Sequence, residues 1–525
     1  MFTFTVYDLL AKNLADNIDH QALAHGSIKV SYGDLGQRVD TIATWLHENG
    51  VQRGDRVGIY LPKTIEEVVA TFAIARIGAV FVNINYQWTL HQLQYVINDC
   101  NIRILFTDQH RIRKIEKSEL INQLDHVVVK DGTRESPKTT LWGKIPEITF
   151  TLARGAIDTE LAALLYTSGS TGNPKGVMLT HLNIIQGARS VACYLKNTSA
   201  YRVLGLLPMS FDYGLSQITT MFLVGGTVVL QPVMMPAEIV KSVTSQQVTG
   251  IAAVPPAWMP IVRYLQDVKT DLPSLRYITN SGGKIPPTIL KAMPEVFPNV
   301  DIYLMYGLTE AFRSAYLPPH LFHEKMGAIG KAIPNAELYV VDPDKGLCEV
   351  GETGELIHRG SLISLGYWNN PEATADKIKP CKHLKHIIGD EKVLFSGDMV
   401  RIDEDNILWF VSRTDSLIKS SGFRISPTEV EDIVYESGLV SDVVAFGKED
   451  NFLGQAVQIA AAPIDETPMP VDELMKYCRQ NMPNYMVPQK VHDWNGQMPR
   501  ISSGKIDRQK VIAACMEKLY DTTTD

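Results

Sequence analysis

One segment combines the side chains and the backbone that a polyanion needs. After the apolar run Leu161–Tyr166 come hydroxyls, glycines and a lysine, namely Thr167, Ser168, Gly169, Ser170, Thr171, Gly172, Lys175 and Gly176. Glycine lets a backbone turn tightly and brings its N–H groups close to a ligand. These donors predict a triphosphate-binding loop, although the spacing differs from the Walker pattern, in which Gly-Lys-Ser/Thr leads directly into a helix. A solvated Ser/Gly linker is the alternative, but linkers seldom join two apolar runs.

A second set of candidate residues follows the strand expected at 275–279. Gly282 and Gly283 form a double glycine, which admits the close approach of a flat ring, and Lys284 comes directly after them. We count these three residues among the candidate ATP-binding residues. The pattern by itself is also typical of a simple turn. We therefore weigh it together with the segments that follow.

A third segment, Met305–Glu310, brings an aromatic ring, a hydroxyl and a carboxylate close together in the chain. The ring of Tyr306 can stack on a purine, the hydroxyl of Thr309 can reach a phosphate, and the carboxylate of Glu310 can bind Mg²⁺ through oxygen. Gly307 lies between them. A buried tyrosine followed by a helix cap at 309–310 is the alternative interpretation.

These segments resemble, in order, the signature motifs of the adenylate-forming superfamily, which includes acyl-CoA synthetases, luciferases and the adenylation domains of nonribosomal peptide synthesis. Residues 164–181 resemble its phosphate loop, and Tyr306–Glu310 resembles its Tyr-Gly-x-Thr-Glu motif. In that motif the tyrosine stacks on adenine, the threonine contacts the α-phosphate and the glutamate binds Mg²⁺, so the resemblance implies ATP and Mg²⁺ as cofactors. One departure is Leu304, where the family usually has a polar residue near adenine. Backbone contacts must substitute there.

Further matches extend the resemblance towards the C-terminus. Ser396-Gly397-Asp398 is similar to Thr-Gly-Asp, whose aspartate accepts hydrogen bonds from both ribose hydroxyls, a task that suits the two acceptor oxygens of a carboxylate. Arg413 lies in a segment similar to Gly-Arg-x-Asp and is implied to contact ribose. Asp415 is the implied hinge of a mobile domain, and Gly422 is implied to line the tunnel by which a thiol arrives. Taken alone, Asp398 would equally fit an exposed turn.

Lys505 lies in a glycine-containing loop within Pro499–Arg508. A lone surface lysine is usually solvated, but this context resembles the family's catalytic-lysine motif, Pro-x-x-x-x-Gly-Lys. A mobile ammonium between the substrate carboxylate and the α-phosphate would neutralise the negative charge that opposes attack. The resemblance therefore implies that Lys505 is catalytic, together with Thr309 and Glu310.

Composition excludes several classes of protein. The formal net charge of −8 gives no basic footprint for nucleic acid. The longest apolar stretch, Val68–Val82, is broken by Arg76 and is too short to span a bilayer, and the N-terminus lacks the pattern of a signal peptide. The six cysteines contain no Cys-x-x-Cys pair, which argues against a disulfide framework or a zinc site. We expect a cytoplasmic protein without a membrane span.

The order of expected elements predicts the fold class. At 525 residues the chain exceeds what one core usually serves, and repeated strand–helix–strand units predict an α/β fold with mostly parallel, helix-covered sheets. Short extended runs between residues 331 and 411 predict a small β-subdomain. We expect an N-terminal adenylate-binding domain over 1–412 and a small, mobile α+β domain over 413–525 that carries Lys505.

The resemblance implies two half-reactions. A carboxylate first attacks the α-phosphorus of ATP and gives an acyl-adenylate and pyrophosphate. No general base is needed, because the nucleophile is already ionised near neutral pH. The small domain then rotates about Asp415, and a thiol attacks the adenylate.

The residues Phe211 and Asp212 lie where family members place the acyl pocket. Amino-acid adenylation domains have Phe-Asp here, and the aspartate pairs with the substrate ammonium. A carboxylate in an apolar pocket is costly unless a cation pairs with it, which favours a substrate that carries an amine. Ser210–Thr220 also resembles stand-alone prolyl-carrier-protein ligases, and this resemblance implies a small, proline-like amino acid as the substrate. The alternative is that Asp212 caps a helix beginning at Tyr213.

The acceptor expected from this resemblance is the phosphopantetheine thiol of a separate carrier protein, since no carrier domain follows Lys505. An acyl-CoA or aryl-CoA synthetase that uses CoA is the alternative. A non-catalytic nucleotide-binding scaffold is disfavoured because Lys505, Glu310 and Asp398 are all present. A luciferase-like oxidation would need a luciferin-type substrate and oxygen.

Overall fold

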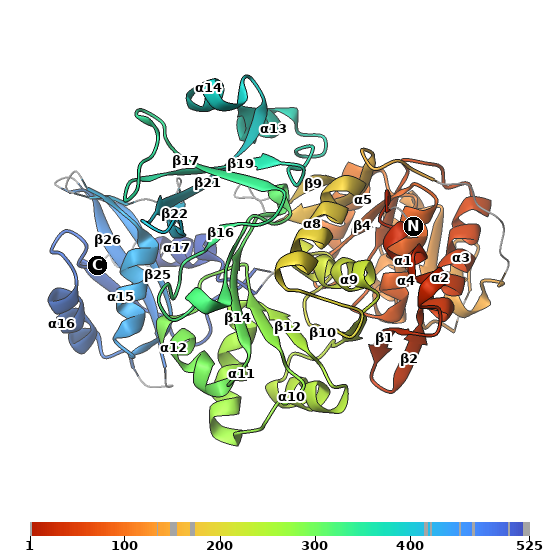
Figure 1. The fold of residues 1–525 in the computed structure, drawn as a ribbon, viewed down its shortest axis with the longest axis horizontal. Helices are drawn as coiled ribbons and strands as arrows, with labels where there is room; N and C mark the ends of the chain where they lie inside the picture. Colours follow the sequence, from red (N-terminus) through yellow and green to blue (C-terminus); the bar gives the residue numbers. More distant parts are fainter. Residues whose placement is uncertain are drawn as a thin grey trace.

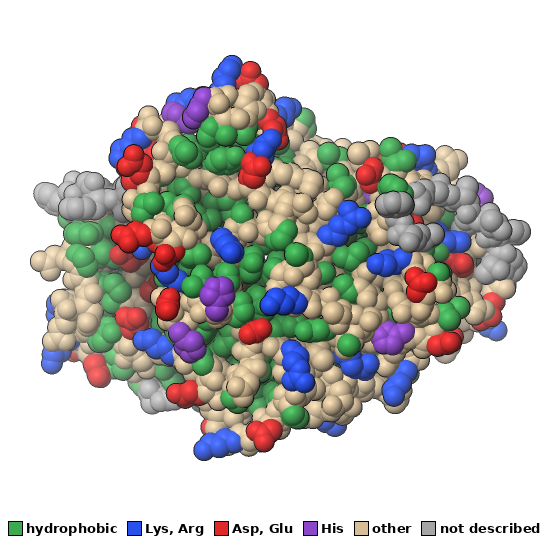
Figure 2. All heavy atoms as spheres, in the orientation of Figure 1, with side chains coloured by type: hydrophobic (Ala, Val, Ile, Leu, Met, Phe, Trp, Pro, Cys, Tyr) green, Lys and Arg blue, Asp and Glu red, His purple; other side chains and the backbone are tan. Residues whose placement is uncertain are grey.

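A computed structural model describes residues 3–133, 135–147, 155–167, 174–413, 418–420, 423–450, 453–464, 468–501 and 504–517. In this part of the chain, two large sheets and their helices form most of the molecule, and two smaller sheets follow (Figure 1). No helix of the described residues is both long and apolar enough to cross a membrane. Acidic and basic side chains are intermixed over the face shown in Figure 2.

The first large sheet has seven strands in the described residues, and it carries the predicted phosphate loop. Its strands are parallel except for the β8–β9 hairpin. In spatial order they are β7 (Thr139–Leu141), β6 (His126–Val129), β5 (Ile104–Thr107), β3 (Arg56–Ile59), β4 (Val80–Asn83), β8 (Leu161–Thr167) and β9 (Lys175–Thr180).

The second large sheet has nine strands in the described residues, and its central strands β10, β12, β13 and β14 are parallel. In spatial order the strands are β16 (Lys331–Ala332), β15 (Ala315–Leu317), β14 (Asp301–Tyr306), β13 (Tyr277–Asn280), β12 (Gly250–Ala253), β10 (Arg202–Gly205), β11 (Thr227–Leu230), β1 (Gln21–His25) and β2 (Ile28–Ser31). Because parallel strands present their carboxyl ends at one edge, the loops after β10, β13 and β14 meet there.

Helices cover the two sheets, and α8 packs against α9 in the middle of the molecule (Figure 1). One continuous apolar core includes Phe81 from the first sheet and Ile278 from the second. The helices of this part are α1 (Asp8–Ala11), α2 (Asn13–Asp16), α3 (Tyr32–Glu48), α4 (Ile65–Arg76), α5 (Leu90–Cys100), α6 (Gln109–Glu116), α7 (Leu120–Gln123), α8 (His181–Tyr194), α9 (Asp212–Val224), α10 (Pro236–Ser245), α11 (Pro255–Val268) and α12 (Pro287–Val296).

A third sheet corresponds to the β-subdomain predicted for 331–411. It contains β17 (Ala336–Asp342), β18 (Gly346–Leu347), β19 (Thr353–Gly360), β20 (Ile378–Pro380), β21 (Lys392–Ile402) and β22 (Leu408–Arg413). Its paired strands are antiparallel, and α13 (Pro371–Lys377) and α14 (Lys385–Ile388) lie beside it. Single 3₁₀ turns occur at η1 (Trp142–Lys144), η2 (Thr309–Ala311), η3 (Pro319–Leu321) and η4 (Lys382–Leu384).

The fourth sheet, after residue 417, has its own core around Val430, Val443 and Ile459. It contains β23 (Ile418–Ser420), β24 (Phe423–Ile425), β25 (Val440–Asp450), β26 (Gly454–Pro463) and β27 (Lys490–Asp493), with α15 (Pro427–Glu436), α16 (Val471–Asn481) and α17 (Arg508–Glu517). The predicted α/β class, with parallel sheets and a small final α+β unit, is confirmed. The domain bounds at 412 and 413 stay a prediction, and β22 runs through both positions.

Gly214 fixes the start of α9 against the chain that leads into it. A Cβ added there would lie 2.0 Å from the carbonyl oxygen of Pro208, which forces a shift of backbone. We expect Gly214→Ala to lower the free energy of unfolding by about 1–3 kcal/mol, as overpacking of a core does, and to lower the apparent melting temperature in calorimetry. Gly143→Ala is the control, because no atom lies within 4 Å of its added Cβ. Equal melting temperatures for the two variants would contradict this close approach.

Candidate active site

Most of the predicted site residues that the structure describes converge at the carboxyl edge of the nine-stranded sheet. Phe211 and Asp212 follow β10, Gly282 and Gly283 follow β13, and Tyr306 ends β14. The hairpin β8–β9 and the turn in β21 approach from the other sheets. Three groups of predicted residues lie outside the described residues. They are the predicted phosphate-loop residues Ser168, Gly169, Ser170, Thr171 and Gly172, the predicted hinge Asp415, and Gly422 of the predicted thiol tunnel.

The residues predicted to bind adenosine form one hydrogen-bonded group. The Tyr306 hydroxyl donates to Oδ2 of Asp398, and Nε of Arg413 lies 3.4 Å from Oδ1 of Asp398. Burial raises the pKa of Tyr306, and the Asp398 charge raises it further, so this hydroxyl stays a donor. Asp398 is buried, which excludes the exposed-turn alternative. A carboxylate oriented in this way can accept hydrogen bonds from a ribose.

Asp212 has a cation of its own. Nη1 of Arg313 lies 2.6 Å from Oδ2 of Asp212, with side chains only 3% and 5% exposed, and the Thr309 hydroxyl donates to Oδ1 at 3.3 Å. The Arg313 guanidinium also lies over the ring of Tyr213, 4.7 Å from its centroid. Asp212 therefore needs no substrate amine to balance its charge, contrary to our expectation from the sequence.

The alternative that Asp212 caps a helix is wrong. Helix α9 begins at Asp212 itself, and its N-cap, Phe211, makes no side-chain capping bond. The carboxylate instead faces Arg313 and Thr309. Sequence reasoning missed Arg313, although it stands just after Glu310 in the motif and is the charge that an apolar pocket with an aspartate requires.

Lys505 lies between the residues of the acyl side and those of the ribose side. A Cβ added at Gly282 would lie 3.7 Å from Cε of Lys505 and 3.6 Å from the ring of Phe211, at van der Waals contact with both residues. Part of the Lys505 side chain is exposed to solvent. The surrounding residues nevertheless desolvate its ammonium and lower its pKa. Repulsion from Arg413 lowers this pKa further, whereas Asp398 and Asp212 oppose the shift.

The described ends of the phosphate loop, Thr167 and Lys175, face each other across the β8–β9 hairpin. The Thr167 hydroxyl donates to the carbonyl of Lys175 at 3.5 Å. The Lys175 ammonium lies 5.5 Å from the ring centroid of Tyr367, a residue that sequence reasoning missed. The two described ends of the loop therefore lie next to each other, beside Tyr367.

Glu310 presents a carboxylate close to this loop. Its Oε1 accepts a hydrogen bond from the Tyr367 hydroxyl at 2.6 Å, and Oε2 has no hydrogen-bond partner among the described residues. No cluster of three potential metal-binding His, Cys, Asp or Glu side chains occurs in the described part of the chain. A single carboxylate with a free oxygen fits Mg²⁺ that is held mainly by phosphates, because Mg²⁺ commonly binds one or two carboxylates together with substrate phosphates.

The remaining predicted residues occupy different environments. Gly307 follows Tyr306 and lies against the backbone of Arg313. The carbonyl of Gly283 accepts a hydrogen bond from the Asn280 amide at 3.0 Å, which holds the double-glycine turn. Lys284 forms an ion pair with Asp432 of α15, and its contact with ATP stays a prediction.

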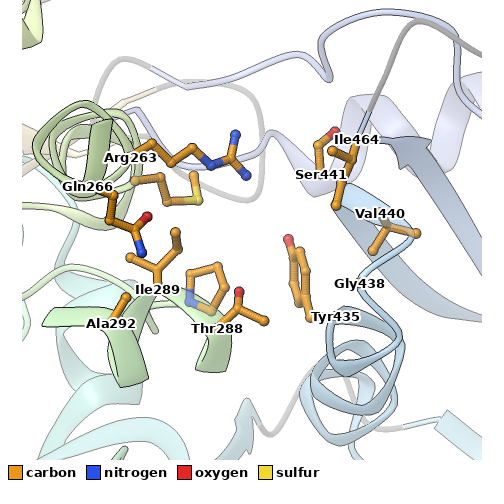
Figure 3. A pocket seen from close by; sticks show the side chains of 12 residues that line it. Arg263, Gln266, Thr288, Ile289, Ala292, Tyr435, Gly438, Val440, Ser441 and Ile464 are labelled. Carbon is orange, nitrogen blue, oxygen red and sulfur yellow. The ribbon is translucent and has the colours of Figure 1, made fainter. Parts of the chain in front are cut away.

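The Lys284–Asp432 pair joins α12 and its preceding loop to the C-terminal part of the chain. A cavity of about 280 Å³ lies between the same elements, with Arg263 and Thr288 on one side and Tyr435 and Ser441 on the other (Figure 3). Packing between α11–α12 and α15–β25 is therefore incomplete. The Lys284–Asp432 ion pair is a polar contact across these elements.

A second cavity lies beside Arg313 and α9. It is lined by apolar and aromatic side chains together with polar ones, including Asn197, Gln217 and Thr220. Several of its buried polar atoms have no hydrogen-bond partner among the described residues, namely Asn197 Oδ1, Gln217 Oε1, Thr220 Oγ1, and Nε and Nη2 of Arg313. Unpaired buried groups are costly, and this cavity of about 20 Å³ can hold one water molecule that hydrogen-bonds with them.

Two family models match the chain. The model of the AMP-binding enzyme matches residues 10–368, and that of the AMP-binding enzyme C-terminal domain matches 429–505. A long-chain-fatty-acid–CoA ligase of Bacillus subtilis (strain 168) is 26% identical over 97% of this chain and 94% of its own length. Gramicidin S synthase 2 of Brevibacillus brevis is 26% identical over 96% of this chain, which spans only 11% of that protein.

Solved structures of similar proteins cover nearly the whole chain. The anthranilate CoA ligase AuaEII in complex with anthranoyl-AMP has a TM-score of 0.89 and 23% identity, and the match covers 99% of each chain. The o-succinylbenzoate CoA synthetase of Bacillus subtilis, in complex with its acyl-adenylate intermediate, has a TM-score of 0.83 and 25% identity over 96% of this chain and 97% of that one. The first match shows a shared fold.

The ion pair between Lys284 and Asp432 predicts a measurable change in local opening. We expect Lys284→Glu to increase deuterium uptake in α12 and α15, because it places two negative charges together at a contact with little apolar packing. Pairs of this partly exposed kind are worth about 1 kcal/mol or less, so the change in opening should be up to about fivefold.

Two variants control this prediction. The charge-swapped Lys284→Glu/Asp432→Lys should return uptake towards that of the original protein. Lys291→Glu, on the exposed side of α12, should leave it unchanged. Equal uptake in Lys284→Glu and the charge-swapped variant would show that the pair does not hold the two parts together.

Proposed function

The chain belongs to the family of AMP-binding enzymes, and from this premise we propose that it activates a carboxylic acid with ATP and transfers the acyl group to a thiol. The acid and ATP would give an acyl-adenylate and pyrophosphate. The thiol would then take the acyl group, release AMP and lose its proton. The chain is proposed to use Mg²⁺ with ATP, as the o-succinylbenzoate CoA synthetase structure with ATP and magnesium does.

The position of Lys505 carries this proposal. It lies against Gly282 and Phe211 on the acyl side and is close enough to Asp398 and Asp212 for their charges to act on its ammonium. A carboxylate placed beside Phe211 and an adenosine placed on Asp398 would bring their reacting atoms near this one cation. Such an arrangement suits the joining of a carboxylate oxygen to the α-phosphorus.

The chemical problem of the first step is repulsion between two anions. Lys505 would place its positive charge where the carboxylate and the α-phosphate meet, and Lys175 would do so near the outer phosphates. Thr309, held by Asp212, directs its hydroxyl oxygen towards the same region. When bound, Mg²⁺ neutralises phosphate charge, and Glu310 would hold it through Oε2. We propose that these groups contribute to catalysis mainly by orienting the acid and ATP relative to each other.

For the second step, Lys505 must leave so that a thiol can approach. The C-terminal part of the chain contacts the rest through a hollow interface and the Lys284–Asp432 pair, which supports a unit that can undock. We propose rotation about Asp415, with Gly422 lining the thiol path, as the family resemblance implies. Both residues remain predictions.

The size of the second cavity and the polar atoms around it support a small acid with hydrogen-bonding groups. The cavity holds only about 20 Å³, which is too little for a fatty acyl chain, and polar atoms of Gln217, Thr220 and Arg313 have no hydrogen-bond partner among the described residues. A small amino acid such as proline belongs to the favoured class. The carboxylate of Asp212 and the amide oxygen of Gln217 are candidate partners of its amine.

The acceptor is proposed to be a phosphopantetheine thiol. CoA and carrier proteins both present this group, and the chain is similar both to CoA ligases and to part of a gramicidin synthase. We propose a separate carrier protein as the acceptor for an amino-acid substrate. Thioester formation with CoA is the alternative, and mass spectrometry of the product with each acceptor distinguishes them.

Lys505 predicts a pH dependence. Its pKa is lowered, so the ammonium form is lost as pH rises through a range below that of an ordinary lysine. We expect kcat/KM for adenylate formation, which reports on the free enzyme, to fall on the alkaline side in that range. Lys505→Arg should keep its charge there and show no such fall, even if its rate is lower.

The variant Lys505→Ala separates binding from chemistry. Removal of a charge that acts mainly in the transition state should lower adenylate formation by about 100-fold or more, and ATP affinity should change little in a calorimetric titration. An equal loss of both would contradict the catalytic assignment. If kcat/KM still falls at alkaline pH in Lys505→Arg, the pH dependence belongs to another group.

Pyrophosphate exchange identifies the acid. We expect labelled pyrophosphate to enter ATP with small polar acids, amino acids among them, and not with long-chain fatty acids. Strong exchange with fatty acids alone would contradict the polar-acid proposal. The polar residues that line the cavity are the physical reason for this order.

The substitution Asp212→Asn tests the amine hypothesis directly. If Asp212 binds a substrate ammonium, exchange with an amino acid should fall by about tenfold or more, while exchange with the matching acid that lacks the amine should be retained. If exchange falls equally with both acids, Asp212 acts through its ion pair with Arg313 rather than by binding a substrate ammonium. Val191→Ile, in the apolar part of the cavity lining, is a control for packing alone.

A further inference from the structure

Tyr367 contacts two groups of the site that carry opposite charges. Its hydroxyl donates to Oε1 of Glu310 at 2.6 Å, and its ring lies 5.5 Å from the Lys175 ammonium. Tyr367 is buried, with 7% of its surface exposed. In the described part of the chain Glu310 and Lys175 form no ion pair with each other, although each contacts this one side chain.

The backbone holds Tyr367 at this point. Residues 365–368 run alongside β9, with hydrogen bonds between Leu365 and Met178 and from the Trp368 N–H to the Gly176 carbonyl at 2.7 Å. Tyr367 is bridged to Val177 in this pairing. The Ser364 N–H also donates to the carbonyl of Glu310 at 2.8 Å. The segment is thus fixed both to the hairpin of the phosphate loop and to the turn that carries Glu310.

The other end of the phosphate loop is tied to the same segment through Asp99. The Trp368 indole donates to the Asp99 carbonyl at 2.9 Å, and the Tyr166 hydroxyl donates to the Asp99 carboxylate. Tyr166 directly precedes Thr167, where the described part of the loop begins. Both ends of the loop therefore have a fixed relation to Tyr367.

We propose that Tyr367 is a positioning residue that holds Glu310 ready for Mg²⁺ and prevents the Lys175 ammonium from pairing with that carboxylate. The hydroxyl occupies Oε1 and leaves Oε2 for the cation, and partners of this kind fix the orientation of a metal ligand. The ring gives the ammonium an alternative contact through its π face. Both charges thus remain available to the phosphates. The inference rests on the proposed function, since it assumes that ATP and Mg²⁺ bind here.

The test uses the full chain with Mn²⁺ and α,β-methylene-ATP, a nucleotide that cannot release pyrophosphate. Electron paramagnetic resonance gives the affinity for Mn²⁺ in the nucleotide complex, and calorimetry in EDTA gives the metal-free affinity for the nucleotide. We expect Tyr367→Phe to weaken Mn²⁺ binding by about 10-fold, the effect typical of losing a partner of a metal ligand. Metal-free nucleotide affinity should stay within about twofold, since the ring is retained.

The variant Tyr367→Leu removes the ring as well, so Lys175 becomes free to pair with Glu310. It should weaken both Mn²⁺ and metal-free nucleotide binding. The control is Tyr339→Phe, which removes a similar hydroxyl bond, 2.7 Å long, from Tyr339 to Glu337 on the surface of the β-subdomain. It should change neither affinity.

Several results would overturn the inference. Unchanged Mn²⁺ affinity in Tyr367→Phe would show that the hydroxyl does not position Glu310, and an equal loss of metal-free nucleotide affinity in that variant would show general damage to the loop. Metal-free affinity retained in Tyr367→Leu would show that the ring does not separate the charges. If the unaltered protein binds no nucleotide, the proposed function itself fails, and this outcome is distinct from all of these.

Discussion

An acid and a nucleotide triphosphate repel each other, and the chain must bring them together at one phosphorus atom. In the proposed mechanism, cations stand at separate points around that meeting place. Lys505 approaches from the C-terminal part, and Lys175 stands at the start of β9. The carboxylates nearby, Asp398 and Asp212, are occupied by Arg413 and Arg313. The positive charges can therefore act on substrates rather than on the protein's own acids, and pre-oriented charge of this kind lowers a barrier without reorganisation during the reaction.

The Asp212–Arg313 pair shows how a buried charge changes the meaning of a sequence motif. An unpaired buried aspartate would demand a cationic substrate, whereas a paired one makes no such demand. The pair instead orients Thr309 and leaves Nε and Nη2 of the guanidinium without a hydrogen-bond partner among the described residues. Removing either partner would leave the other charge buried, at a cost of about 3–5 kcal/mol. Asp212 alone therefore does not identify the substrate.

Local patterns in the sequence predicted much of the fold, because helix periodicity and short buried strands are local properties. Apolar residues recur at helical spacing between Tyr32 and Glu48, and α3 has these bounds. Asp398 and Tyr306, which the motifs assign to the ribose and the adenine of one nucleotide, are hydrogen-bonded to each other. Contacts between distant segments were not predictable in this way. Tyr367 lies 57 residues from Glu310, and Lys284 is 148 residues from Asp432. No spacing pattern in the sequence indicates either contact, because each depends on how separate sheets and the C-terminal unit pack against each other.

The central claim is that a carboxylate oxygen bonds to the α-phosphorus of ATP. It is tested most directly by turnover of an acid, chosen by pyrophosphate exchange, whose two carboxylate oxygens are both ¹⁸O. Transfer of the acyl group to a thiol breaks the bond between the acyl carbon and that oxygen, so mass spectrometry should find one ¹⁸O in each AMP released. Label in inorganic phosphate with formation of ADP, or AMP without label, would contradict the account.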